Sequence, residues 1–358
     1  MNTIGIGIVC LILPLLGSAM FLDPACGIRA PIPTVPRIIN GAIAPLRSSP
    51  WMAFLHTTDN YFVCGGTLIT NRLVLTAAHC YLKNFTYTNL VARLGEYDRD
   101  DVEKCYGNYC TLRIEGKVDR GFKHRLFDPD TLAYDIALLR LKQRVEYRDN
   151  IRPICIVTDT RWRNYINSLD PLTGTGWGRT EKGQDSGYLR TVDLSRQDPI
   201  YCLMYTAKHI LKTQFCAGNL DSGFCNGDSG GPVGALIPYK KSSRFIQVGI
   251  SSFGNHRCAN ASVFTNVMSH VDWILLVHNN YTYCAAGCKS AINTNRVTQK
   301  RGAEDSESAG IAFGQVETVA IASPGRLPRF VFHCLQLSNA ITLAPSNAAD
   351  LAKWKTNL

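Results

Sequence analysis

Two short runs in the first quarter of the chain decide the fold class: FLHTTDNYFVCGGTLIT at Phe54 to Thr70 and VLTAAHC at Val74 to Cys80. Short runs of this kind, rich in β-branched and aromatic residues, recur along the chain and are broken by Gly, Asn and Asp, which is typical of short strands joined by turns. One helix is expected late in the chain, because apolar residues recur at helical spacing between Met268 and Leu275. We therefore predict an all-β barrel or sandwich closed by a C-terminal helix.

The 358 residues divide into four segments. Residues 1–20 contain the apolar run IGIGIVCLILPLL followed by small residues, which predicts a cleaved signal peptide and a secreted, extracellular protein. Residues 21–37 hold four prolines and one cysteine and are expected to form a tether without a core of its own. Residues 38–280 have a globular composition, whereas residues 281–358 form a polar, alanine-rich tail to which we assign neither fold nor activity.

The composition narrows the class of protein further. A hydrophobic content of 46% is enough for a sizeable core and argues against a disordered chain. The 14 cysteines lack the paired CxxC repeats of zinc ribbons, so they favour disulfides in an oxidising compartment. The net charge of +10 comes from dispersed basic residues rather than from a run, so we expect neither a nucleic-acid nor a membrane partner.

Three separate segments carry the residue types of a nucleophilic triad: TAAHC with His79, YDIALLRL with Asp135 and CNGDSGGP with Ser229. A serine hydroxyl is a weak nucleophile at neutral pH, so it needs a base to take its proton and a carboxylate to orient that base. The glycines beside Ser229 would let the backbone N–H groups of Gly227 and Ser229 converge on an oxyanion. Singly, each segment has an ordinary structural explanation; together they predict acyl-transfer chemistry.

In the order His, Asp, Ser, these segments closely resemble the chymotrypsin-like serine proteases over about residues 37–280. The resemblance implies two antiparallel Greek-key β-barrels with a C-terminal helix, and a serine endopeptidase that needs no cofactor. The cysteine-bearing propeptide, the loop after RLGEYDRDD and the AGNLDSGFCNGDSGGP segment are most similar to arthropod haemolymph proteases of the clip-domain group. The clip domain itself, with six cysteines ahead of the activation site, is missing.

RIING at residues 37–41 is similar to the activation site of this family. The resemblance implies that cleavage after Arg37 frees the ammonium group of Ile38, which would pair with the buried carboxylate of Asp228. A buried charge is tolerated only when it is paired. We therefore expect a zymogen that an upstream protease of basic specificity activates.

The family resemblance also implies a disulfide pattern, although spacing alone leaves the alternatives open. Cys10 would leave with the signal peptide, and Cys284, Cys288 and Cys334 remain as an odd number in the tail. One free or intermolecular thiol follows, or the tail is not natural sequence. The expected pairs are Cys26 with Cys155, Cys64 with Cys80, Cys105 with Cys110, Cys202 with Cys216, and Cys225 with Cys258.

The primary specificity pocket departs from the trypsin pattern. Trypsin-type enzymes have an aspartate six residues before the nucleophile, where this chain has Gly223. A shifted loop could instead bring Asp221 into the pocket. By resemblance Gly254 and Ser262 would form the walls, and the ISSFG strand containing Ser252 would bind an extended substrate. We expect a medium or large apolar residue before the scissile bond, although Phe224 could narrow the cavity.

Smaller motifs suggest modification and a metal. The acceptor pattern for N-glycosylation occurs at Asn84, Asn260 and Asn280. Glu96 and Asp98 fall where some family members bind calcium, although a solvated acidic loop is the plainer interpretation.

The expected partners are protein substrates, the activating protease and protein inhibitors, in an extracellular proteolytic cascade that follows from resemblance only. Two alternatives stay open. A catalytically silent homologue could act as a binding or cascade-assembly protein, because the pocket floor is atypical even though all three triad residues are present. A polyanion-binding protein would need a basic cluster, which is not visible in the linear sequence.

Overall fold

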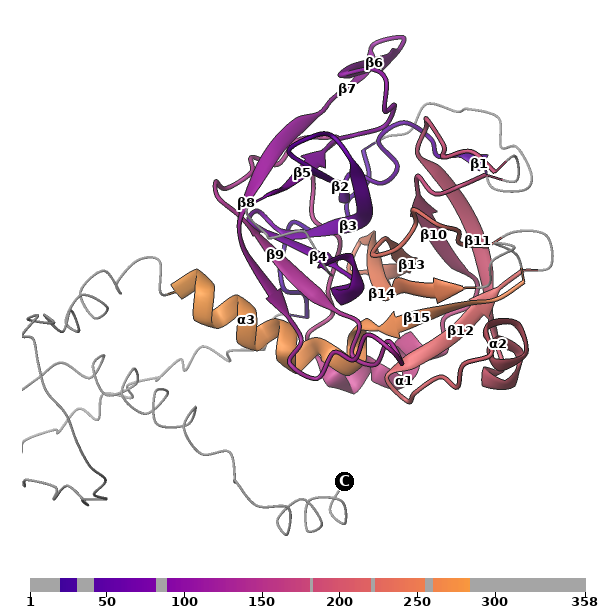
Figure 1. The fold of residues 1–358 in the computed structure, drawn as a ribbon. Coiled ribbons are helices and arrows are strands. Elements are labelled where there is room, and N and C mark those ends of the chain that lie inside the picture. The colour runs from indigo at the N-terminus through magenta and orange to yellow at the C-terminus, as the bar shows by residue number, and fades with distance from the viewer. Residues whose placement is uncertain are drawn as a thin grey trace, which may run out of the picture. The chain divides into compact units, whose positions relative to one another are not determined.

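The structure, a computed structural model, describes residues 20–30, 42–81, 89–180, 183–219, 223–254 and 260–283. Strands dominate, and the fold consists of the two antiparallel β-systems expected from the sequence together with a C-terminal helix (Figure 1). None of the helices in these ranges is both long enough and apolar enough to cross a lipid bilayer. Five residues for which the sequence makes predictions lie outside the described ranges: Arg37, Ile38, Asn84, Asp221 and Cys258.

The first β-system is a closed barrel of six antiparallel strands. β2 closes it by pairing with both β3 and β5, for example Leu55 with Cys64 and with Ala92. Most residues of β2, β3, β4, β5 and β9 are buried, and many of them are aliphatic, as expected for strands that enclose a packed barrel. In barrel order the strands are β2 (Met52–Thr57), β3 (Phe62–Thr70), β4 (Leu73–Thr76), β9 (Ala137–Leu141), β8 (Ile114–Lys123) and β5 (Leu90–Leu94).

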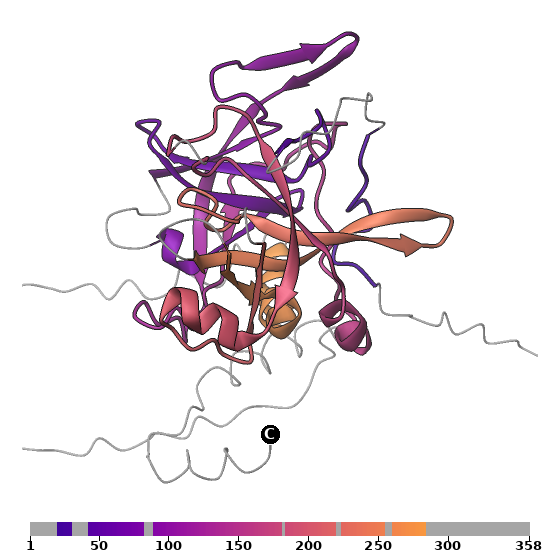
Figure 2. The same ribbon diagram turned by 90° about the vertical axis from the view of Figure 1, so that its right-hand side faces the viewer.

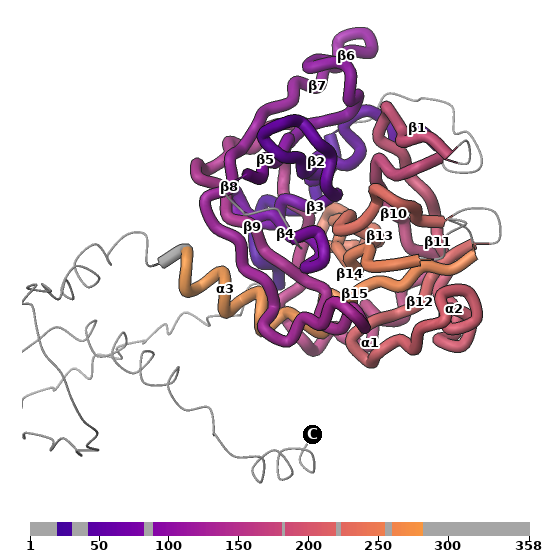
Figure 3. The backbone as a smooth tube through the Cα atoms, in the orientation of Figure 1, coloured from indigo at the N-terminus to yellow at the C-terminus, as the bar shows by residue number. Residues whose placement is uncertain are grey.

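The second β-system is a seven-stranded antiparallel sheet that an additional β11–β12 pairing closes into a ring. Figure 3 shows the two systems as an indigo-to-purple half and a magenta-to-orange half of one chain. In sheet order the strands are β1 (Ala42–Ile43), β11 (Arg190–Gln197), β10 (Leu172–Gly176), β13 (Pro232–Tyr239), β14 (Ser242–Gly254), β15 (Ser262–Asn266) and β12 (Gln214–Gly218).

Helices are short except at the end of the described chain. The apolar spacing from Met268 to Leu275 corresponds to a 3₁₀ turn that runs into one long helix, as the sequence predicts. The helices are η1 (Ala78–Tyr81), η3 (Thr160–Trp162), α1 (Arg163–Asn167), α2 (Pro199–Thr206), η4 (Val267–His270) and α3 (Val271–Tyr283).

A small hairpin, β6 (Glu103–Tyr106) and β7 (Tyr109–Leu112), projects from the first barrel (Figures 1 and 2). The disulfide Cys105–Cys110 joins its two strands across directly opposed positions. The structure contains three further expected disulfides: Cys26–Cys155, Cys64–Cys80 and Cys202–Cys216. Cys225 is also disulfide-bonded.

The segment 20–30, part of the expected propeptide, is bound along the body of the fold by more than its disulfide. The Leu22 N–H donates to Ile156 O at 3.0 Å, and Gly27 exchanges backbone hydrogen bonds with Pro153 and Phe245. The Arg29 guanidinium lies 4.5 Å from the centroid of the Phe245 ring. Cleavage after Arg37 would therefore leave this segment attached both covalently and through its backbone.

Candidate active site

His79 and Asp135 come together because their strands are neighbours. His79 lies in η1 just after β4, Asp135 lies just before β9, and β4 pairs with β9. The Asp135 carboxylate is fully buried, and its Oδ2 lies 2.7 Å from His79 Nδ1 while its Oδ1 accepts the His79 backbone N–H at 2.8 Å. With an ionised Asp135, Nδ1 carries the proton and donates it, which leaves Nε2 free to act as a base.

The second β-system supplies two further contacts to Asp135. Ser252 Oγ of β14 donates to Asp135 Oδ2 at 2.5 Å, and Thr265 Oγ1 of β15 donates to the Asp135 backbone carbonyl at 2.9 Å. A buried carboxylate is stable only when its oxygens are hydrogen-bonded, so Ser252 stabilises the Asp135 side chain, while Thr265 holds the Asp135 backbone in place. They are 117 and 130 residues away in the chain, and no local sequence signal identifies them. The sequence had placed Ser252 in the substrate strand; its side chain lies on Asp135.

Ser229 lies in the turn that leads into β13. Backbone hydrogen bonds connect this turn to both β-systems. The Gly65 N–H donates to Ser229 O, and the Gly230 N–H donates to Ser251 O, both at 2.8 Å. Gly230 has φ +77°, and a Cβ there would collide with Thr76 Oγ1, three residues before His79. The serine turn can approach the histidine strand this closely only with glycine at that position.

No hydrogen bond joins Ser229 Oγ to His79 in the part of the chain that the structure describes; His79 Nε2 lies 3.8 Å from Cys80 Sγ. Catalytic hydrogen bonds are often long without substrate and tighten in the reactive complex. Gly227 has φ +97°, again the left-handed region, so its backbone can turn the N–H toward the position expected for an oxyanion.

An aromatic wall lies behind Gly227. A Cβ at Gly227 would contact the Phe62 ring at 3.3 Å, and that ring stacks on Phe54 with centroids 4.3 Å apart. The Arg99 guanidinium covers Phe62 at 5.1 Å from the centroid and pairs with Asp185 at 3.6 Å. This stack packs the oxyanion segment against the first barrel, and the sequence analysis did not identify it.

Asp228 has the environment of a carboxylate that awaits a cation. Its Oδ1 accepts the Gly178 N–H at 2.8 Å, and its Oδ2 accepts the Cys225 N–H at 2.9 Å. A Cβ at Gly176 or Gly178 would collide with the carboxylate, which explains the glycines of GTGWG. Burial raises the Asp228 pKa to about 6, since two N–H donors offset the desolvation only in part. No Lys, Arg or His side chain of the described ranges forms an ion pair with it.

The expected pocket residues adjoin one another and are small. A Cβ at Gly254 would contact Ser262 Oγ at 3.1 Å and the Phe224 backbone carbonyl at 3.7 Å. The Phe224 ring itself is buried in the core of the second β-system, edge-on to Phe264 at 5.3 Å. A Cβ at Gly174 would collide with that ring, so Gly174 provides the space into which it turns. The Phe224 ring therefore packs in the core of the second β-system. The sequence had left open that this ring narrows the specificity pocket.

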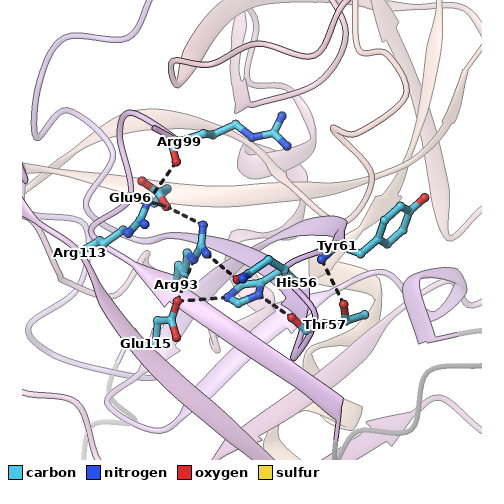
Figure 4. A network of polar contacts seen from close by, with 9 residues as sticks. His56, Thr57, Tyr61, Arg93, Glu96, Arg99, Arg113 and Glu115 are labelled. Atoms are coloured by element: carbon cyan, nitrogen blue, oxygen red, sulfur yellow. Dashed lines mark hydrogen bonds and ion pairs between the residues drawn. The ribbon is translucent and has the colours of Figure 1, made fainter. Parts of the chain in front are cut away.

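The two carboxylates considered for calcium face cations of the protein itself. Glu96 is paired with Arg113 at 3.0 Å and with Arg93 at 3.6 Å, as Figure 4 shows, and Asp98 is paired with Lys104 at 2.8 Å. Calcium requires six to eight oxygen ligands, and neighbouring cations repel it. These residues do not fit a calcium ion.

The structure also describes two of the three predicted glycosylation sites and two groups of potential metal ligands. Asn260 has a left-handed backbone with φ +72° and is half-buried, and Asn280 is half-buried on α3. Two groups of potential metal ligands occur in the described ranges, Cys64, His79 and Cys80 in one and Glu103, Cys105 and Cys110 in the other. Their cysteines are all in disulfides and so offer no thiolate to a metal.

Comparison with known proteins agrees with this geometry. The Trypsin family model matches residues 38–274. Serine protease 7 of Drosophila melanogaster is 34% identical over 281 residues, covering 73% of this chain and 69% of its own. The proclotting enzyme of Tachypleus tridentatus is 35% identical over 273 residues, covering 71% of this chain and 68% of its own.

Among solved structures, the Drosophila Grass clip serine protease of the Toll pathway matches with a TM-score of 0.61 and 30% identity. The match covers 71% of this chain and 74% of that one. A family model spanning most of the chain, relatives above 30% identity and the paired barrels all agree. The chain belongs to the trypsin family and is a serine-type endopeptidase of the chymotrypsin fold, related to the clip-domain proteases of arthropods.

Proposed function

We propose that the protein is a secreted zymogen that, once cut after Arg37, hydrolyses protein substrates in an extracellular proteolytic cascade. His79 is the general base, Asp135 orients it, and Ser229 is the nucleophile that forms the acyl-enzyme. The backbone N–H groups of Gly227 and Ser229 stabilise the oxyanion; losing one such donor typically costs about 100- to 1,000-fold in rate. The observation that carries the proposal is the buried Asp135, which binds His79 through two hydrogen bonds beside the glycine-lined serine turn.

Activation is proposed to run through Asp228. Its carboxylate is buried with two N–H donors; Arg190 attracts it electrostatically, but no cation of the described ranges forms an ion pair with it. The new ammonium group of Ile38 would supply that partner and stabilise the ionised form. Ser229 follows Asp228 directly in the chain, so fixing the Asp228 carboxylate also fixes the backbone of the oxyanion hole.

The substrate is proposed to carry an apolar residue before the scissile bond. Gly223, Gly254 and Ser262 are small, and the Phe224 ring packs in the core. None of these three described residues carries a charge that could offset the desolvation of a substrate cation. An upstream protease of basic specificity would cut after Arg37, so this enzyme would not activate itself.

The experiment is to express the chain from Phe21, cut it after Arg37, confirm Ile38 as the new amino terminus and profile cleavage on a peptide library. Turnover should require the cut and should vanish in Ser229→Ala, with apolar residues before the cleaved bond. Preference for Lys or Arg would place Asp221 in the pocket. No turnover by folded, correctly cut protein would favour the catalytically silent homologue.

A further inference from the structure

A cavity of about 230 Å³ lies on the face where the β3–β4 turn, β9 and α3 meet, with residues of the 20–30 segment. Its lining includes three arginines, Arg72, Arg140 and Arg144, together with His278 and Tyr281 of α3. Cavities for drug-sized ligands are about 300 to 1,000 Å³. This one suits a single small charged group rather than a large apolar molecule.

A fourth arginine reaches the same place from β8. The Arg120 guanidinium lies 5.5 Å from the centroid of the Tyr281 ring, whose other contact is Phe122 at 4.3 Å. Arg120 is also directly opposite Arg140 in the β8–β9 pairing. Three arginines therefore line the cavity, and a fourth lies over Tyr281, one of the lining residues.

The acidic residues of this region do not neutralise all four. Asp119 is occupied by Arg140, at 2.7 Å and 3.0 Å, and by Arg72 at 3.5 Å. Asp23 accepts hydrogen bonds from the Tyr147 hydroxyl and the Ala25 N–H. In the described ranges neither Arg120 nor Arg144 forms an ion pair with a carboxylate; Arg144 donates only to the amide oxygen of Asn71 at 3.3 Å.

Exposed lysines extend the positive charge away from the cavity. The Lys142 N–H donates to Lys117 O at 2.8 Å, so Lys142, which directly follows β9, lies beside Lys117 within β8. Arg72 links them to the cavity by donating to Lys142 O at 3.2 Å. Clustered like charges repel one another, and a bound polyanion would relieve that repulsion.

We propose that this cavity and its flanking cations, Arg120, Arg144, Lys117 and Lys142, form a binding site for a linear sulfated polysaccharide. A sulfate group would enter the cavity, where planar guanidinium groups bind tetrahedral oxyanions through paired N–H donors. Neighbouring sulfates would contact the two lysines. None of the residues named for this site belongs to the triad, the oxyanion hole or the activation site, so the inference does not rest on the proposed catalysis or on cleavage after Arg37.

The test uses the full chain as an uncut zymogen carrying Ser229→Ala, and heparin hexasaccharide as the probe. Arg120→Gln combined with Arg144→Gln should raise the dissociation constant at least about tenfold at about 0.15 M salt. The slope of log affinity against log salt should fall by about one per lost contact. Lys212→Gln combined with Lys241→Gln removes the same charge from exposed positions elsewhere and should change affinity less than about twofold.

Equal effects of the two double variants would overturn the proposal, because binding would then follow net charge alone. Free sulfate binding as tightly as the hexasaccharide would reduce the site to a small-anion site and overturn the polysaccharide assignment. A single-stranded oligonucleotide of equal charge that bound as tightly, with the same loss in the Arg120 and Arg144 variant, would overturn the preference for sulfated sugar. Unsulfated polymer should not bind.

Discussion

The ionisation of Asp228 is expected to make the stability of the zymogen depend on pH in an unusual direction. The folded-state pKa is about 6, against an ordinary value of 3.8. Because the folded pKa is raised, the folded zymogen holds the proton more tightly than the unfolded chain. This contribution to stability is fully present below about pH 4 and is lost as the pH rises through 6.

The magnitude follows from the pKa difference. At about 1.4 kcal/mol per pKa unit, the zymogen should lose about 3 kcal/mol of unfolding free energy between pH 4 and pH 7 through this group. Asp228→Asn cannot ionise, so it lacks this pH dependence. It leaves one N–H donor unmatched at every pH, which shifts its curve by a constant amount.

The assay is urea unfolding with disulfides intact, at several pH values, in Ser229→Ala protein with and without Asp228→Asn. The difference between the two curves should change by about 3 kcal/mol across this range in the uncut zymogen. After cleavage at Arg37 it should change in the opposite direction, because the Ile38 ammonium group would hold Asp228 ionised. Parallel curves in the zymogen would refute the burial argument; no change on cleavage would refute the ion pair with Ile38.

Three further outcomes are expected. Ser252→Ala removes a donor from buried Asp135 and should lower kcat about tenfold or more with little change in KM, whereas Ser243→Ala on the exposed end of β14 should leave kcat unchanged; equal kcat values would show that the contact is dispensable. Gly174→Ala should cost about 1 to 3 kcal/mol in thermal or urea unfolding, because its methyl group meets the Phe224 ring, and that cost should disappear in a Phe224→Ala background; a cost that persists there would place the clash elsewhere. Calcium and EDTA should give the same Tm, because arginine and lysine occupy the acidic pair near β5; a calcium-dependent rise in Tm would contradict this.

Local sequence was sufficient for the class of fold. Short β-branched runs and one late helical period predicted an all-β body with a terminal helix, and the structure agrees. Four of the disulfides expected by resemblance are present. The strand and helix patterns are local, so the linear sequence contains them, whereas the disulfide pairings followed only from the family resemblance.

Contacts between distant segments were decided only by the tertiary structure. Ser252 and Thr265 reach Asp135 because the second β-system packs on the first, and the direction of the Phe224 ring depends on the space left by Gly174. The surroundings of Glu96 and Asp98 also depend on the tertiary structure, which places Arg113 beside Glu96 and Lys104 beside Asp98.

The arrangement of the basic residues shows most clearly what the tertiary structure decides. In the sequence the basic residues are dispersed and predict no polyanion site, yet β-pairing places Arg120 opposite Arg140, and Tyr281 of α3 lines the same cavity as Arg72 and Arg140 and lies against Arg120. The type of each side chain is a property of the sequence. Which charges meet depends on strand register and helix packing, and those are set by burying the apolar faces of all the elements together.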